Sequence, residues 1–143
     1  MKTILITGAT SGIGKSTAEL LAKQGNRIII CGRRSEVLES LKEELLQFTE
    51  IFSLKFDVRN LDEVETAINS LPEEWKDIDV LINNAGNAHG LDPLSSGKTD
   101  DWDSMIDGNV KGLLYVSKMI IPGMKTKNLG HIINISSVAA RQT

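Results

Sequence analysis

The sequence predicts an α/β fold, a doubly wound parallel sheet of the Rossmann type, and three observations support this prediction. Five short apolar segments alternate with helical segments along the 143 residues. The apolar segments are continuous, which indicates strands that are buried on both faces. Each connection is long enough to return the next strand in parallel. Helices should therefore cover both faces of the sheet, in which we expect the strand order 3-2-1-4-5.

The first strands and the first helix follow one another without long loops. Lys2–Thr7 and Arg27–Cys31 are apolar runs, and Phe52–Phe56 is the third strand. The helix between the first two strands covers Lys15–Gln24, where apolar residues recur at helical spacing. Gly25 follows this helix, and we expect a left-handed C-cap there.

The second and third helices begin at residues suited to helix N-termini. Ser35 is expected to cap the second helix. The third helix opens at Asn60-x-x-Glu63, which resembles a capping box, and runs to Leu71. The apolar stripe of the second helix consists of Val37, Leu38, Leu41, Leu45 and Phe48.

The last elements are a strand, a long helix and a final strand. Asp79–Asn83 has an apolar centre and forms the fourth strand. The helix covers Asp101–Ile121 and is broken at Pro122-Gly123, because proline disrupts helix interiors. His131–Ile135 is the fifth strand.

Composition excludes several classes of function. A net charge of -3 gives no reason to expect a nucleic-acid or acidic-membrane partner. A single cysteine, Cys31, excludes an internal disulfide and a cysteine-based metal cluster, and we predict no metal site. No apolar run approaches the ~20 residues that span a bilayer. We therefore expect one domain in the cytoplasm.

The loop after the first strand is rich in glycine, reading Thr7-Gly-Ala-Thr-Ser-Gly-Ile-Gly14. Its spacing is neither that of the G-x-G-x-x-G fingerprint nor that of a P-loop. Glycines in a strand-to-helix turn let the backbone approach a ligand, and the helix N-terminus attracts a pyrophosphate. The predicted phosphate-binding residues are Gly8, Thr10, Ser11, Gly12, Ile13 and Gly14.

Three further motifs follow this loop in order, each on the expected element. They are Asn83-Asn-Ala-Gly86, Asn109-Val-x-Gly112 and Ile133-Asn-Ile-Ser-Ser137. With the glycine loop, they resemble the signatures of the short-chain dehydrogenase/reductase family over the whole chain. The resemblance implies hydride transfer between a nicotinamide cofactor and a small-molecule substrate.

The end of the second strand indicates which nicotinamide cofactor is used. An acidic residue there would hold the ribose hydroxyls of NAD, but the sequence reads Cys31-Gly-Arg-Arg34. Guanidinium groups bind a 2′-phosphate, which a carboxylate would repel. We predict NADP(H), with Arg33 and Arg34 at the phosphate. The alternative is two solvated arginines before a helix.

Residues after the third and fourth strands should complete the cofactor site. In the family that the chain resembles, Asp57 would bond the adenine amino group and Val58 would lie near the ring. Asn84 and Ala85 should touch the cofactor, or Asn84 should hold the adjoining backbone. Gly86 would let the chain pass close to the ribose.

The resemblance also assigns two catalytic residues. Ser137 would bind the substrate oxygen, and Asn109 would support the catalytic lysine through water. Alternatively, Ser137 satisfies backbone at the strand end, and Asn109 bonds a neighbouring loop. The Tyr-x-x-x-Lys motif of the family is absent, because Met119 stands four residues after Tyr115, the only tyrosine. These residues alone should therefore be inactive.

A sheet ending at the fifth strand would expose an apolar edge. We therefore expect residues 1–143 to be the N-terminal part of a longer single-domain enzyme, which the resemblance implies to be a homo-oligomer. Trp102-Asp-Ser-Met-Ile-Asp107 and Ile121-Pro-Gly-Met124 resemble the NADP-dependent 3-hydroxy acid dehydrogenases, which include serine and L-allo-threonine dehydrogenases. A 3-oxoacyl or general carbonyl reductase remains an alternative. So does a non-catalytic dinucleotide-binding module, if the chain ends at Thr143.

Overall fold

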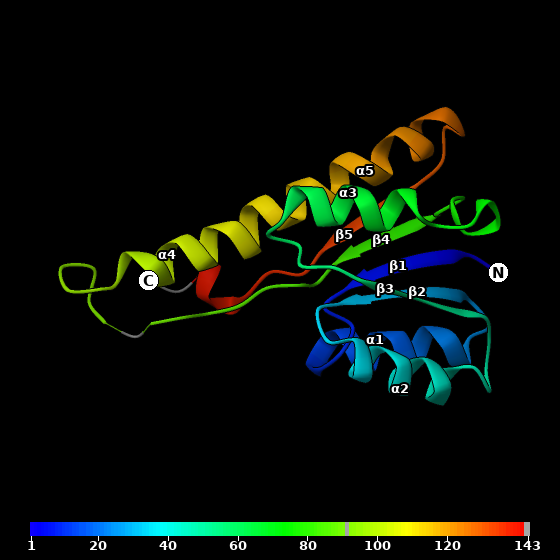
Figure 1. The fold of residues 1–143 in the computed structure, drawn as a ribbon, viewed down its shortest axis with the longest axis horizontal. Coiled ribbons are helices and arrows are strands. Elements are labelled where there is room, and N and C mark those ends of the chain that lie inside the picture. Colours follow the sequence, from blue (N-terminus) through cyan, green and yellow to red (C-terminus); the bar gives the residue numbers. More distant parts are fainter. Residues whose placement is uncertain (91, 142–143) are drawn as a thin grey trace.

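The fold is a single parallel sheet with helices on both of its faces (Figure 1). The computed structural model describes residues 1–90 and 92–141. The strand order is β3-β2-β1-β4-β5, which confirms the predicted Rossmann-like topology. The strands are β1 (Thr3–Thr7), β2 (Arg27–Gly32), β3 (Ile51–Lys55), β4 (Val80–Asn83) and β5 (His131–Asn134).

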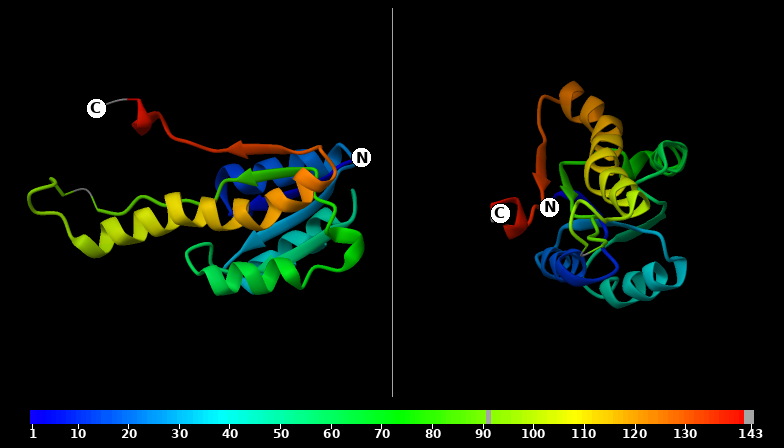
Figure 2. Two further views of the ribbon diagram at one scale, coloured as in Figure 1. Left: turned by 90° about the horizontal axis from the view of Figure 1, so that it is seen from above. Right: turned by 90° about the vertical axis from the view of Figure 1, so that its left-hand side faces the viewer.

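The helices are divided between the two faces of the sheet. α1 (Gly12–Lys23) and α2 (Ser35–Leu45) cover one face, whereas α3 (Leu61–Asn69) and α5 (Gly112–Thr126) cover the other (Figure 1). α4 (Thr99–Ile106) projects beyond the sheet in line with α5 (Figure 2). Three short segments complete the fold: the 3-10 turns Glu73–Trp75 and Val138–Ala140, and the π-helical turn η2 (Asp107–Lys111).

Successive strand residues supply two separate cores, as expected for a sheet covered on both sides. Ile28 and Ile30 of β2 pack with α1 and α2, while Ile29 between them packs with the α3 and α5 layer. All three side chains are fully buried. The strands read as continuous apolar runs because each face of the sheet needs its own apolar partner.

Two of the predicted helix ends are confirmed. Gly25 has φ +78°, and the N–H of Asn26 donates to the carbonyl of Leu21, which closes α1 in a Schellman motif. The side chain of Asn60 accepts hydrogen bonds from the first turn of α3. α1 itself begins at Gly12, three residues earlier than predicted, so the last glycines of the loop lie within its first turn.

Three details of the sequence prediction are wrong. Ser35 is already helical, and the N-cap is Arg34, which makes no side-chain capping bond. Phe48 lies beyond α2 and is 42% exposed, with Lys23 over its ring. Pro122 lies inside α5 without ending it. The helix continues there because Ile120 and Met124 on either side are buried against the sheet.

One carboxylate joins several elements at the end of the sheet opposite the carboxyl ends of the strands. Asp79 accepts a hydrogen bond from the N–H of Thr3 at 2.9 Å and from the ammonium of Lys127 at 3.0 Å. Its own carbonyl accepts from the N–H of His131. Asp79 therefore ties β1, β5 and the end of α5 together.

No helix within residues 1–90 and 92–141 is long and apolar enough to cross a membrane. β5 forms an edge of the sheet, where Ile133 and Ile135 are 36% and 40% exposed. The apolar edge expected from the sequence is thus present.

Candidate functional site

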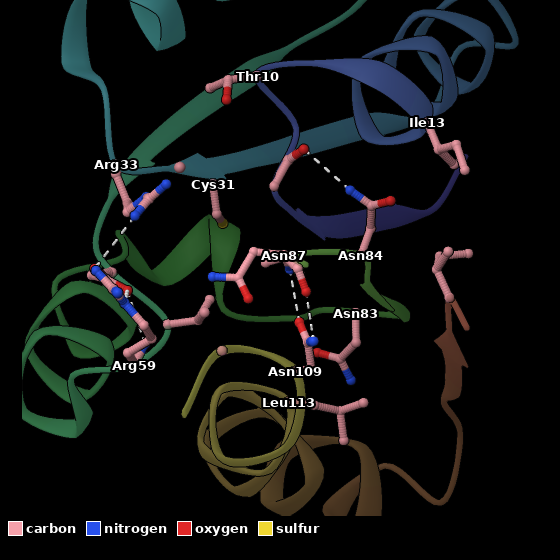
Figure 3. Close-up of a pocket in the computed structure, with 18 of the residues that line it drawn as sticks. Thr10, Ile13, Cys31, Arg33, Arg59, Asn83, Asn84, Asn87, Asn109 and Leu113 are labelled. Atoms are coloured by element: carbon pink, nitrogen blue, oxygen red, sulfur yellow. Dashed lines mark hydrogen bonds and ion pairs between the residues drawn. The ribbon is translucent and has the colours of Figure 1, made fainter. Parts of the chain in front are cut away.

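A cavity of about 1070 Å³ lies at the carboxyl ends of the strands (Figure 3). This is where open α/β sheets bind ligands, since the strand order reverses between β1 and β4. Gly12 and Gly14 are not among its lining residues. The predicted residues that line it are Gly8, Thr10, Ser11, Ile13, Arg33, Arg34, Asp57, Val58, Asn84, Ala85, Gly86, Asn109 and Ser137.

Two different demands explain the glycines of this loop. Gly8 and Gly12 have φ values of +64° and +53°, which L-residues with side chains rarely adopt. Gly14 has ordinary helical geometry, but a Cβ there would lie 2.3 Å from the carbonyl oxygen of Gly8 and 2.4 Å from Nδ2 of Asn84. Gly14 thus serves the packing of the helix beneath the loop, and Gly8 and its neighbours face the cavity.

The N-terminus of α1 is open toward the cavity. Its N-cap, Ser11, makes no side-chain hydrogen bond to the helix, and no acidic residue lies in the first turn. Ser11 and Ile13 both line the cavity. The first N–H groups of a helix have no acceptor within it and carry a partial positive charge. They are therefore available to bind an anionic group.

The hydroxyl of Thr7, at the end of β1, connects the loop to β4. Its Oγ1 accepts hydrogen bonds from the N–H groups of Asn84 at 3.0 Å and Ala85 at 2.9 Å. The side-chain amide of Asn84 donates to the carbonyls of Thr7 and Gly8. Asn84 thus holds the neighbouring backbone, one of the two roles expected for it. Thr7 opens the glycine-loop motif, but the sequence pattern assigned no separate role to its hydroxyl.

The two predicted arginines lie together at the end of β2. Nη2 of Arg34 donates to Oγ1 of Thr10 at 3.3 Å, so Arg34 contacts the glycine loop. Nη1 of Arg33 is 4.0 Å from Oδ2 of Asp57, and its side chain is 66% exposed. Both line the cavity, which places two guanidinium groups beside the N-terminus of α1.

Asp57 is held by Arg59, a residue that the sequence reasoning missed. The Arg59 guanidinium donates to both carboxylate oxygens, with Nη2 only 2.6 Å from Oδ2, and its N–H donates to Oδ1 (Figure 3). These contacts with Arg59 lower the pKa of Asp57. The only signal in the sequence was an arginine two residues after the aspartate.

Asn109 lies in the π-helical turn and bonds the loop after β4. Its Oδ1 accepts from the N–H of Asn87, and its Nδ2 donates to the carbonyl of Asn87, both at 2.8 Å (Figure 3). A Cβ on Gly86 would lie 2.9 Å from Oδ1 of Asn109. The structure therefore shows Asn109 bonded to a neighbouring loop, which was the alternative role given for it. A side chain at position 86 would clash with Asn109, which explains the glycine there.

Ser137 follows β5 at the edge of the cavity. Its Oγ accepts from the N–H of Ala139 at 3.2 Å, which is the backbone contact given as the alternative role of Ser137. Among the described residues, its hydroxyl proton has no acceptor. Ser136 lines the cavity beside it, whereas Tyr115 packs against the core of the α3 and α5 layer. Of Ser137 and Tyr115, only the serine belongs to the cavity.

The floor of the cavity contains two buried groups. Asn83 donates to Oγ of Ser117 and to Oδ1 of Asn134, both at 3.0 Å, and so joins β4, α5 and β5. Cys31, near the end of β2, is buried, and this burial raises the pKa of its thiol. Among the described residues, no group of His, Cys, Asp and Glu side chains is arranged to hold a metal ion.

The fold and the position of this cavity define a Rossmann-like α/β protein. The model of the short chain dehydrogenase family matches residues 2–143. The chain therefore belongs to the short-chain dehydrogenase family, as its four motifs predict.

Relatives within the family are similar over nearly the whole chain. NADP-dependent 3-hydroxy acid dehydrogenase YdfG of Salmonella typhi is 46% identical over 136 residues, 95% of this chain and 54% of the relative. Serine 3-dehydrogenase of Agrobacterium fabrum is 44% identical over 138 residues, 96% of this chain and 54% of the relative. The chain thus spans about half the length of the curated relatives it matches.

A solved structure agrees with these relatives. The closed form of a serine dehydrogenase complexed with NADP+ is 45% identical and superimposes with a TM-score of 0.90. The similarity covers 97% of this chain and 55% of that one. The resemblance to 3-hydroxy acid dehydrogenases predicted from the sequence is therefore confirmed at the level of family relatives.

Proposed function

We propose that the protein is a cytoplasmic oxidoreductase that transfers a hydride between NADP(H) and a small 3-hydroxy acid or carbonyl compound. The observation that carries the proposal is the pair of arginines at the end of β2, in the same cavity as the open N-terminus of α1. Two guanidinium groups match a 2′-phosphate, and the helix N-terminus matches a pyrophosphate. The names of the relatives support the same cofactor and substrate class.

The cavity residues fit such a cofactor along its length. Gly8, Thr10 and Ser11 of the glycine loop line the cavity at the N-terminus of α1, where the pyrophosphate would lie. Asp57 has a lowered pKa and stays ionised near neutrality, so it would accept a hydrogen bond from the adenine amino group. Val58 supplies an apolar surface for the ring, and Ala85 and Gly86 line the path toward the serine.

When bound, the cofactor supplies or accepts the hydride. The part of this chain is to hold the reacting oxygen and fix the surrounding backbone. Ser137 lies at the edge of the cavity and would donate its hydroxyl proton to the substrate oxygen. Asn109 fixes the loop after β4 through two hydrogen bonds to Asn87, and so holds Asn87 and Gly86 in the wall of the cavity.

The cofactor proposal is tested by binding measurements on the purified protein. NADPH should bind more tightly than NADH, with dissociation constants measured by calorimetry. Arg33→Ala combined with Arg34→Ala should weaken NADPH binding by about 10- to 100-fold, because hydrogen bonds between charged groups are lost. NADH binding should change little. Equal affinity of the unmutated protein for the two cofactors would refute the proposal.

The substrate class is tested separately on the longer enzyme expected from the sequence, because residues 1–143 lack the Tyr-x-x-x-Lys motif. The panel consists of serine, L-allo-threonine, other 3-hydroxy acids and simple aldehydes. NADP-dependent oxidation of the 3-hydroxy acids supports the proposal, whereas activity on carbonyl compounds alone favours a general carbonyl reductase. Ser137→Ala should then lower kcat more than it raises KM.

A further inference from the structure

The carboxylate of Asp57 lies between two arginines but is bound by only one of them. Arg59 approaches it with Nη2 at 2.6 Å from Oδ2 and Nε at 3.0 Å from Oδ1. Arg33 stays at 4.0 Å from Oδ2 (Figure 3). Arg59 is thus the dominant partner, and Arg33 makes only a loose ion pair.

This division decides how freely Arg33 can bind another anion. A carboxylate with no other strong donor draws a nearby guanidinium to about 2.7–2.9 Å, and the N–H groups used in that pair are lost to other ligands. Because Arg59 supplies a guanidinium fork and a backbone N–H to Asp57, the Arg33 guanidinium is left two-thirds exposed.

The local charge balance also depends on Arg59. Arg33, Arg34 and Arg59 contribute three positive charges, against the carboxylates of Asp57 and of Glu63, which accepts the N–H of Asp57 at 2.9 Å. The five groups carry a net charge of +1. Without Arg59 the sum is zero, and the attraction for a phosphate dianion falls accordingly.

We propose that Arg59 is a positioning residue that sets the preference for NADPH over NADH. It binds the Asp57 carboxylate, so that this carboxylate does not form a close ion pair with Arg33. This inference rests on the proposed function, in which Arg33 binds the 2′-phosphate. Arg59 makes no contact with that phosphate and acts through Asp57. With Arg59 in place, the same pocket can hold Asp57 for the adenine and Arg33 for the 2′-phosphate.

The experiment compares NADPH and NADH binding in Arg59→Gln, Arg59→Lys and the unmutated protein. Arg59→Gln should lower the preference for NADPH by about tenfold, the size expected for one partly screened charge near the site. Arg59→Lys should keep most of the preference, because it restores the charge. Lys118→Gln is the matched control, since it removes a surface cation that pairs with Glu65 outside the cavity.

A double-mutant cycle with Arg33 shows whether Arg59 acts through that residue. In an Arg33→Ala background, Arg59→Gln should change the preference much less, because there is no Arg33 for Asp57 to pair with and only the change in local charge remains. An undiminished effect in that background would overturn the inference, as would equal weakening of NADPH and NADH binding by Arg59→Gln. If the unmutated protein shows no preference for NADPH, the proposed function fails instead, and the two failures are thereby distinguished.

Discussion

At the scale of single residues, the site depends on a few atoms that hold backbone segments together. Oγ1 of Thr7 is the acceptor for two N–H groups of the loop after β4. Gly14 permits the contact between α1 and the glycine loop. Neither residue presents a functional group to the cavity, yet both determine where the cavity residues lie.

Thr7→Val should destabilise the protein by about 2–4 kcal/mol, because two N–H groups lose their acceptor. Thr7→Ser keeps the hydroxyl and should cost clearly less. Urea denaturation of the two variants gives the comparison. A Thr7→Val variant as stable as Thr7→Ser would show that the hydroxyl does not secure this loop.

Gly14→Ala should cost about 1–3 kcal/mol and weaken cofactor binding, since its Cβ meets the Gly8 carbonyl. Gly123→Ala is the matched control. Position 123 is helical, and a Cβ there would meet no atom within 4 Å, so alanine should stabilise α5 by about 0.5–1 kcal/mol. Thermal unfolding of both variants checks the opposite signs, and a stable, fully binding Gly14→Ala variant would contradict the packing argument.

At the scale of elements, the long helical segment is where sequence and structure differ most. The sequence predicts one helix that breaks at Pro122, but the structure has α4, a π-helical turn and α5, with Pro122 inside α5. Helix propensity alone cannot reveal a π-helical turn. The turn depends instead on how Asn109 and Gly112 fit against neighbouring loops. A Cβ on Gly112 would lie 2.7 Å from Cγ2 of Val58.

Pro122→Ala should stabilise the protein by about 1–2 kcal/mol. Alanine restores the missing N–H donor and removes the ring from the helix interior, partly offset by a more flexible unfolded chain. Pro122 is exposed, so no core contact is lost. The measurement is the free energy of unfolding in urea, and a destabilised variant would show that the proline relieves strain at the end of α5.

At the scale of the whole molecule, Asp79 connects β1, β5 and the end of α5. Burial tends to raise the pKa of this carboxyl, but the N–H of Thr3 and the ammonium of Lys127 outweigh it and leave the pKa below its ordinary value. A carboxyl with a lowered pKa stabilises the folded state above its unfolded pKa of about 3.9. This contribution is lost as the pH falls through the folded pKa.

Asp79→Asn should therefore destabilise the protein at pH 7 and have a smaller effect as the pH falls below about 4. Urea midpoints of the variant and the unmutated protein, measured from pH 7 to pH 3, give the difference. Asp77→Asn is the control, because Asp77 contacts the same lysine but is 77% exposed. A difference that stays constant with pH would argue against the role of the ionised carboxylate.

The sequence predicted the fold and most of the cavity lining because both depend on local patterns. Continuous apolar runs mark the buried strands, and the parallel topology brings the residues that follow them to one edge. What remained hidden depends on contacts between distant segments. Examples are the hydrogen bonds from Arg59 to Asp57 and those between Asn109 and Asn87. They depend on side-chain geometry, which the periodicity of the sequence does not encode.

The position of Cys31 has a practical consequence. It is the only thiol in the chain, it is 1% exposed, and it lies in the floor of the cavity. A thiol reagent can react with it only when the sheet opens there, since burial also suppresses the thiolate. The rate of labelling thus reports how often the sheet opens locally at Cys31. A ligand in the cavity should slow this labelling, so its binding can be followed through the protein's own thiol, without an engineered cysteine.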